Sequence, residues 1–176
     1  MKPPSTEELI DRAAISDLVI AYATGLDRRD WALYRSIFTN EIDMEFSSAG
    51  IKPGRYSADD WMRDAQRLFA GLETSQHTST NHVHTLRGDD ATCVSNMQAE
   101  HFVAAGLEDS PPPGHERWTI GGNYVNELVR TSAEDTPGGW KLRAVTLNVT
   151  WSTGNPEVMR IALRRGRAAT TESTRR

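Results

Sequence analysis

The chain of 176 residues is 38% hydrophobic and 25% charged, the composition of one ordinary globular domain. A formal net charge of -4 offers no overall attraction to phosphate backbones or anionic lipid, so neither nucleic-acid nor membrane partners are expected. The single cysteine, Cys93, excludes an intrachain disulfide. It favours the cytoplasm and is expected to be an inert core thiol. There is no apolar signal core and no 18-residue apolar run, so neither export nor a membrane span is expected.

The first 40 residues predict two helices. Ser5 and Glu8 have the spacing of a capping box, and apolar residues recur behind them at helical spacing. Gly25 is expected to end this helix, and Asp30 to cap a second one. Asp27 is therefore predicted to lie in the turn between the two helices.

The rest of the chain predicts one strand, a third helix and a meander. Residues 41–48 alternate like a strand, and Ser57 can cap an amphipathic helix. The pattern then changes to period two in four stretches: 75–87, 91–105, 116–131 and 139–151. This order predicts a single α+β domain over residues 1–155, in which a curved antiparallel sheet carries three helices on one side. The basic residues of 156–176 predict a flexible tail.

Alternation along the predicted strands assigns side chains to faces of the sheet. His101 falls on the apolar side of its strand, together with Cys93. His82 and His84 share a face that is predicted to be opposite that of His77. Their i, i+2 spacing could begin a metal site, but nothing nearby completes it, so no metal is expected.

Two short segments supply a carboxylate, a phenol and an imidazole: YATGLDRRDW contains Tyr22 and Asp27, and SQHTSTNH contains His77. If Asp27 bonds one nitrogen of His77, it fixes the tautomer and leaves the other nitrogen as a general base. Such a dyad with a phenolic acid can move protons on an organic substrate without a cofactor. Each residue could instead have a purely structural role. Asp27 could stabilise a turn, His77 could be a hydrogen-bonded histidine of a strand, and Tyr22 and His101 could be part of the core.

The phrases AAISDL, YATGLDRRDW, FTNEIDMEF, SQHTSTNH, GGNYVNEL and GWKL resemble the SnoaL-like branch of the nuclear-transport-factor-2-like superfamily, over roughly residues 8 to 152. The resemblance implies a cone-like α+β barrel whose helices enclose a pocket. It is specific for the fold and less so for the chemistry, because this fold serves many reactions.

Within that superfamily the chain resembles scytalone dehydratase, hexachlorocyclohexane dehydrochlorinase and bile-acid 7α-dehydratase, which all catalyse eliminations. The resemblance implies that Asp27 matches their aspartate after the first helix and His77 their histidine at the start of the meander. Tyr22 matches the tyrosine of the bile-acid enzyme, and His101 the second pocket histidine of scytalone dehydratase. The implied catalytic set is therefore Asp27, His77, Tyr22 and His101.

The residues that orient the substrate depart from the relatives. Phe46 stands where scytalone dehydratase has a tyrosine, and the arginine of the relatives' final strand has no counterpart in TLNVTW. The expected substrate contacts are Phe46, Met97, Trp118, Asn123 and Tyr124. Since these substrate-orienting residues differ, the resemblance does not imply the identity of the substrate.

The leading hypothesis is a cofactor-independent, dehydratase-like lyase of secondary metabolism that acts on a hydrophobic small molecule. One alternative is an isomerase, or a polyketide- or terpenoid-type cyclase, that uses the same dyad without a leaving group. Another is a non-catalytic binding or assembly subunit. Exposed apolar sheet surface in related folds commonly supports oligomers, so a homodimer or homotrimer is expected.

Overall fold

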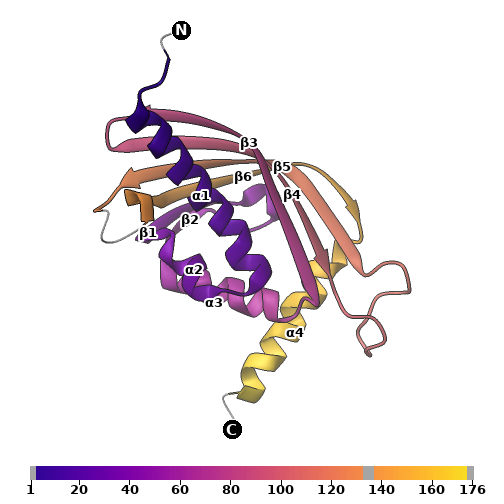
Figure 1. The fold of residues 1–176 in the computed structure, drawn as a ribbon. Coiled ribbons are helices and arrows are strands. Elements are labelled where there is room, and N and C mark those ends of the chain that lie inside the picture. The colour runs from indigo at the N-terminus through magenta and orange to yellow at the C-terminus, as the bar shows by residue number, and fades with distance from the viewer. Residues whose placement is uncertain (1–2, 133–136, 174–176) are drawn as a thin grey trace.

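The computed structural model describes residues 3–132 and 137–173. Its helices are α1 (Thr6–Arg28), α2 (Trp31–Ser36), α3 (Ala58–Ala70) and α4 (Glu157–Ser173). Its strands are β1 (Phe38–Glu45), β2 (Gly54–Ser57), β3 (Thr74–Arg87), β4 (Asp90–Phe102), β5 (Arg117–Arg130) and β6 (Trp140–Gly154). The six strands form one curved sheet, and α1, α2 and α3 gather on one side of it (Figure 1). None of the described helices has the length and apolarity to span a membrane.

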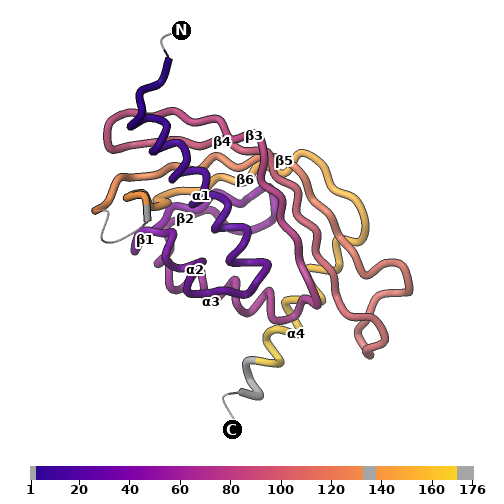
Figure 2. Tube along the Cα trace, viewed as in Figure 1, coloured from indigo at the N-terminus to yellow at the C-terminus, as the bar shows by residue number. Residues whose placement is uncertain are grey.

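The predicted α+β architecture is confirmed, and the sheet departs from it at one pair of strands. The spatial order is β2-β1-β6-β5-β4-β3, and neighbouring strands are antiparallel except for β1 and β6, which run parallel. A parallel pair needs a long crossover connection. Here the connection between them contains β2, α3 and the strands from β3 to β5, which can be followed along the trace in Figure 2.

The C-terminal end of α1 differs from the prediction. The helix continues through Gly25 to Arg28 and ends at Arg29, which has a left-handed backbone with φ of 58°. Gly25 does not stop the helix. Instead it lets α1 approach α2, because a Cβ atom at this position would lie 2.9 Å from the Cβ of Tyr34. As a result Asp27 lies in the last turn of α1 and not in a loop.

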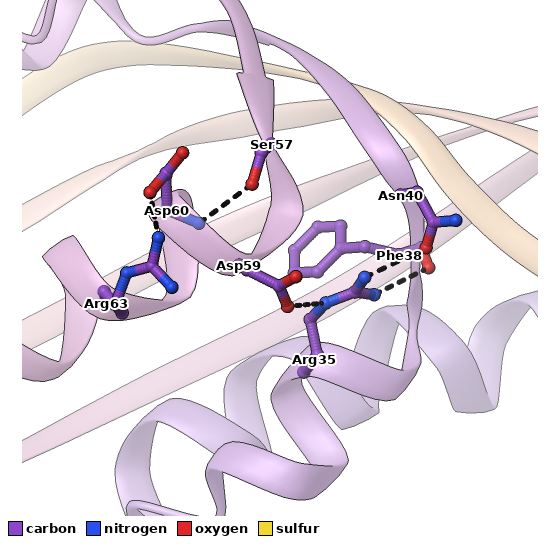
Figure 3. Close-up of polar contacts among 7 residues, drawn as sticks. All are labelled: Arg35, Phe38, Asn40, Ser57, Asp59, Asp60 and Arg63. Carbon is purple, nitrogen blue, oxygen red and sulfur yellow. Dashed lines mark hydrogen bonds and ion pairs between the residues drawn. The ribbon is translucent and has the colours of Figure 1, made fainter.

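The predicted helix caps are present. Glu8 N–H donates to Ser5 Oγ at 3.1 Å, and Ser5 N–H donates back to the Glu8 carboxylate at 2.6 Å. The hydroxyl of Ser57 accepts a bond from Asp60 N–H at 3.2 Å and so begins α3 (Figure 3). The side chain of Arg35 then links α2 to the start of α3.

Aromatic rings fill the space between the helices and the sheet. Tyr22 of α1 lies 5.2 Å from Tyr34 and 5.6 Å from Tyr124 of β5, measured between ring centroids. The cluster continues through Phe38 and Phe46, with mostly edge-to-face contacts. Such contacts stabilise the core beyond their buried area. The interior of the cone is thus largely packed with side chains.

A buried ion pair anchors the N-terminal half of α1. Asp11 accepts bonds from Arg130 Nη1 at 3.0 Å, from Arg130 Nη2 at 2.8 Å and from Trp140 Nε1 at 3.0 Å. The Arg130 guanidinium also lies 4.4 Å from the centre of the Trp140 ring. The hydrogen bond from Arg130 holds the pKa of Asp11 below its ordinary value, against the opposing effect of burial. This contact attaches α1 to β5 and β6.

The segment predicted as a flexible tail, residues 156–176, instead contains helix α4. Val158, Ile161 and Ala162 of this helix are buried, and Figure 1 shows α4 beside α3. The high density of arginine and alanine suggested a solvated segment. Three apolar residues at helical spacing are enough to attach it to the domain.

Strand β3 contains a bulge that reverses its faces. Between Thr80 and Val83 the register of β3 against β4 shifts, and Asn81 has a left-handed backbone with φ of 55°. An extra residue in one strand inverts the alternation beyond it. Val83 is therefore 63% exposed. His82 and His84 lie on the inner face with His77, so their predicted placement on the opposite face was wrong.

Candidate active site

Asp27 and His77 form a hydrogen-bonded dyad between the end of α1 and the start of β3. The Nδ1 atom of His77 lies 2.7 Å from Asp27 Oδ1, and the His77 backbone N–H donates to Asp27 Oδ2 at 2.6 Å. The dyad is largely shielded, since the two side chains are 9% and 21% exposed for His77 and Asp27 respectively. Two contacts to one carboxylate fix both the position and the orientation of the imidazole.

The ionisation of Asp27 determines which nitrogen of His77 carries the proton. Burial acts to raise the pKa of Asp27, but hydrogen bonds from the His77 ring, the His77 backbone and Ser75 outweigh it and hold that pKa below its ordinary value. A carboxylate can only accept. In neutral His77 the proton therefore resides on Nδ1, and Nε2 keeps a free lone pair.

Ser75 and Arg29 support the dyad, and the sequence analysis did not identify either of them. Ser75 Oγ donates to Asp27 Oδ1 at 2.9 Å and accepts a bond from Arg29 Nη1 at 3.0 Å. Arg29 Nη1 also donates to the carbonyl of Leu26 at 2.7 Å. A signal for Ser75 was available, because it lies two residues before His77 and so shares its face of the strand.

Phe69 of α3 forms an apolar wall next to the dyad. Its ring lies 6.0 Å from the His77 ring, with an angle of 25° between the planes. The guanidinium carbon of Arg29 is 5.0 Å from the centre of the same ring, a cation–π distance. Phe69 thus contacts both the His77 ring and Arg29, which supports the Asp27 carboxylate.

His101 is close to the dyad but is uncharged at neutral pH. Its ring centre lies 5.5 Å from that of His77, and the two planes are perpendicular. Burial, aided by the nearby His77, lowers the pKa of His101 to about 4. Among the described residues its Nδ1 atom has no hydrogen-bond partner. The expected contribution of His101 to protonation of a leaving group is therefore limited to that of a neutral imidazole.

Tyr22 and His77 line one small interior space. The space amounts to about 10 Å³, close to the room that one water molecule needs, and Met97 and Tyr124 also line it. Burial, together with the neighbouring Tyr34, raises the pKa of Tyr22 well above its ordinary value. Tyr22 is therefore protonated and can donate a hydrogen bond.

The larger space is an open groove at the mouth of the cone. It has a volume of about 370 Å³, and its walls include Asp27, Arg29, Trp31 and Phe69. Among the described residues the space next to His77 amounts to only about 10 Å³, far less than the enclosed, ligand-sized pocket that was predicted, and the rings of Tyr22 and Tyr124 line it. Of the dyad, Asp27 lines this groove beside Phe69, whereas His77 lines the small interior space.

The structure places the five expected substrate contacts in different surroundings. Met97 and Tyr124 line the interior space next to His77. Phe46 packs on Trp61, and Trp118 lies 6.0 Å from His101. Asn123 is a correction: its side-chain oxygen accepts a bond from Asn148 at 3.0 Å in an exposed setting, on the face opposite Tyr124. Alternation along β5 therefore turns Asn123 away from the site.

A curved sheet covered on one side by three helices is the fold of nuclear-transport-factor-2-like proteins. Within that class the chain belongs to the SnoaL-like family, because residues 7–146 match the SnoaL-like domain.

Several known proteins are similar to the chain over most of its length. A protein from Kribbella flavida of known crystal structure is 31% identical, covers 85% of this chain and 97% of its own, and superposes with a TM-score of 0.74. A hexachlorocyclohexane dehydrochlorinase from Novosphingobium barchaimii is 20% identical, with coverages of 84% and 92% and a TM-score of 0.64. The terrestric acid biosynthesis cluster protein E of Penicillium crustosum is 23% identical over 150 residues, which are 85% of this chain and 90% of that protein.

Proposed function

We propose that the protein is a cofactor-independent lyase that eliminates water, or a similar leaving group, from a hydrophobic small molecule. The observation that carries this proposal is the 2.7 Å contact between His77 Nδ1 and an ionised Asp27, which leaves His77 Nε2 free as a base. The similarity to a dehydrochlorinase and to a protein of a biosynthesis cluster supports the same class of reaction.

In the proposed reaction His77 Nε2 removes a proton from a carbon next to an activating carbonyl group. The electron pair of that C–H bond forms a C=C bond as the C–O bond to the leaving hydroxyl breaks. The Tyr22 hydroxyl donates its proton to the departing oxygen, which leaves as water. The proton on His77 then returns to the Tyr22 oxygen through the water-sized space that both residues line.

Asp27 has a supporting role in each of these steps. While His77 is neutral, Asp27 holds the ring with Nδ1–H toward itself, and when His77 is protonated its negative charge stabilises the imidazolium. General acid–base assistance of this kind contributes roughly 10²–10⁴-fold to a rate. Positioning of the substrate has to supply the remainder.

The residues that line the groove indicate the chemical class of the substrate. Trp31 and Phe69 offer flat apolar surfaces, while Arg29 adds one cation on the same wall. An apolar, ring-containing molecule with a carbonyl or carboxylate substituent is complementary to this lining. Aromatic faces and a guanidinium together suit such a mixed ligand.

The test is a cofactor-free assay of wild type, His77→Ala and His115→Ala against β-hydroxy ketones and hydroxylated polycyclic acids, read by mass spectrometry. His115 is an exposed histidine of the β4–β5 loop and is the matched control. Loss of 18 mass units, about the mass of water, should depend on His77 and not on His115. An unchanged mass with a shifted chromatographic peak would indicate an isomerase or cyclase. Inactivity over the whole panel would favour a binding subunit.

The proposal includes a cytoplasmic location and a homodimer or homotrimer. Support for an oligomer comes from a row of valines on the outer face, where Val83 pairs with Val94 and Val94 with Val125. Val83 and Val94 are 63% and 37% exposed. Light scattering after size exclusion should give two or three subunits for wild type and one subunit for Val94→Lys. A monomeric wild type would contradict this part of the proposal.

A further inference from the structure

A second cluster of chemically capable side chains lies on the inner face of the sheet. It consists of His82 and His84 on β3 and Cys93 on β4, and one ligand atom from each residue lies within 4.8 Å of the other two. The bulge at Asn81 is what brings them together, because it turns both histidines inward. Beyond the bulge His84 is directly opposite Cys93 in the strand register.

The cluster is separate from the dyad. In the register of β3 and β4, His77 is opposite Ala99 and His84 is opposite Cys93. The two positions on β4 differ by six residues (99 − 93), so His84 and Cys93 lie about 20 Å along the strand from His77 at ~3.3 Å per residue. His82 lies nearer, and its partner Ser79 lines the same interior space as His77. A ligand at the cluster would therefore not touch the groove or the Asp27–His77 pair.

Both imidazoles are oriented by hydroxyl groups. Ser79 Oγ lies 3.0 Å from His82 Nε2, and Ser16 Oγ of α1 lies 2.9 Å from His84 Nε2. Metal-binding histidines almost always have one ring nitrogen held by a hydrogen bond while the other binds the ion. Here Nε2 of each ring has the hydroxyl partner, so Nδ1 is the nitrogen that remains for a ligand.

We propose that His82, His84 and Cys93 form a binding site for a soft divalent cation of the zinc type. Two imidazole nitrogens and one thiolate are ligands that Zn²⁺ accepts in tetrahedral sites, and three protein ligands leave one position for water. A bound ion would join β3 to β4 at the bulge and, through Ser16, hold α1 against them. The proposal departs from the sequence-based expectation of no metal, which rested on the lack of a third ligand near the two histidines and on their predicted placement opposite His77.

The proposed binding step balances with what the three residues supply. Each imidazole donates a ring-nitrogen lone pair to the ion, and Cys93 donates its sulfur. Binding of Zn²⁺ would form a zinc–sulfur bond and release the thiol proton to solvent, one proton per ion.

The experiment is a titration of chelator-treated, full-length protein with Co²⁺ and then Zn²⁺, followed by absorption spectroscopy. One equivalent of Co²⁺ should produce a thiolate-to-cobalt charge-transfer band, which Zn²⁺ then removes. The band should disappear in Cys93→Ser and His84→Ala, and persist in the controls His115→Ala and His77→Ala. Ser16→Ala should weaken binding by roughly 10–100-fold, as loss of an orienting partner does at other sites.

The partly exposed His82 allows a variant that is least disturbing to the core. If His82→Ala keeps the circular dichroism spectrum of wild type and loses cobalt binding, this result supports the metal site. It does so even if Cys93→Ser unfolds and its cobalt binding cannot be measured. The proposal is overturned if wild type shows no charge-transfer band. It is also overturned if Cys93→Ser keeps the band or still binds one equivalent of Co²⁺. Release of no proton on Zn²⁺ binding would equally exclude a thiolate ligand.

Discussion

Helix α1 carries two carboxylates that face the sheet, the buried Asp11 and the partly buried Asp27, and they perform different tasks with similar hydrogen bonding. Asp11 accepts two bonds from Arg130 and one from Trp140. Asp27 accepts two bonds from His77 and one from Ser75. Each carboxylate therefore has three donors from the sheet, and in each the bonds hold the pKa below the ordinary value.

The partners determine which carboxylate can take part in chemistry. Arg130 and Trp140 have only N–H donors and do not change protonation state, so Asp11 can do no more than hold the helix in place. His77 has a second ring nitrogen that can accept a proton, and Asp27 lines the open groove. A carboxylate with all its hydrogen bonds made becomes a candidate for catalysis only where its partner can change protonation state and a substrate can approach the pair.

The largest expected effect is on the activity of Asp27→Asn. An amide can donate to His77 Nδ1, which would turn the ring to the wrong tautomer and place the proton on Nε2. We expect kcat/KM to fall by ~10²–10⁴-fold in the cofactor-free assay. The urea midpoint should change less than in Asp11→Ala. Retention of full activity in the folded variant would contradict the role of Asp27.

The complementary variant, Asp11→Ala, should affect stability and not chemistry. It leaves the buried Trp140 N–H without its acceptor and removes two bonds to Arg130, which keeps its ion pair with the exposed Asp89, and this should cost about 2–3 kcal/mol of unfolding free energy. Urea unfolding followed by tryptophan fluorescence measures this loss. The exposed Asp17 on the same helix provides the control, and Asp17→Ala should stay within about 0.5 kcal/mol of wild type.

Acid should remove the contribution of Asp11 in a defined direction. Because the folded-state pKa of Asp11 lies below the ordinary value of 3.8, this carboxylate stabilises the fold fully above that pH and loses its effect as pH falls through the folded-state value. The difference in unfolding free energy between wild type and Asp11→Asn should be constant from about pH 5 to 7 and shrink below about pH 4. A difference that does not vary with pH would indicate that the charge of Asp11 is unimportant.

The smallest effect is expected for Ser75→Ala. This change removes one of the three donors to Asp27 and the hydroxyl that links it to Arg29. A lost hydrogen bond of this type is worth about 1 kcal/mol, so kcat/KM should fall about 5-fold. Ser75→Thr keeps the hydroxyl and should restore most of the rate. Equal losses in both variants would instead indicate a packing effect.

Local signals in the sequence predicted the parts of the structure that depend on neighbouring residues. The caps at Ser5, Asp30 and Ser57 were recognisable because each side chain bonds a backbone N–H only three residues away. The inward face of β4, with Cys93 and His101, followed from simple alternation in an undisturbed strand.

Part of the site could also be predicted, and part could not. The pairing of Asp27 with His77 was expected from two motifs, and the two residues do share a hydrogen bond. The support from Ser75 and Arg29 was not expected, because it depends on the left-handed end of α1. The packed interior likewise depends on how aromatic rings from four elements fit together, which no single segment encodes.

The sequence by itself determined the order of the elements, their caps and the pair of segments that supply the dyad, because these depend on local hydrogen bonds and on period. Only the tertiary structure decided the Asp11–Arg130 contact, which joins residues 119 positions apart. It also decided the attachment of α4 and the inward turn of His82 and His84 at the Asn81 bulge. These features arise from long-range packing and from a shift of one residue in strand register, and neither leaves a periodic signal in the chain.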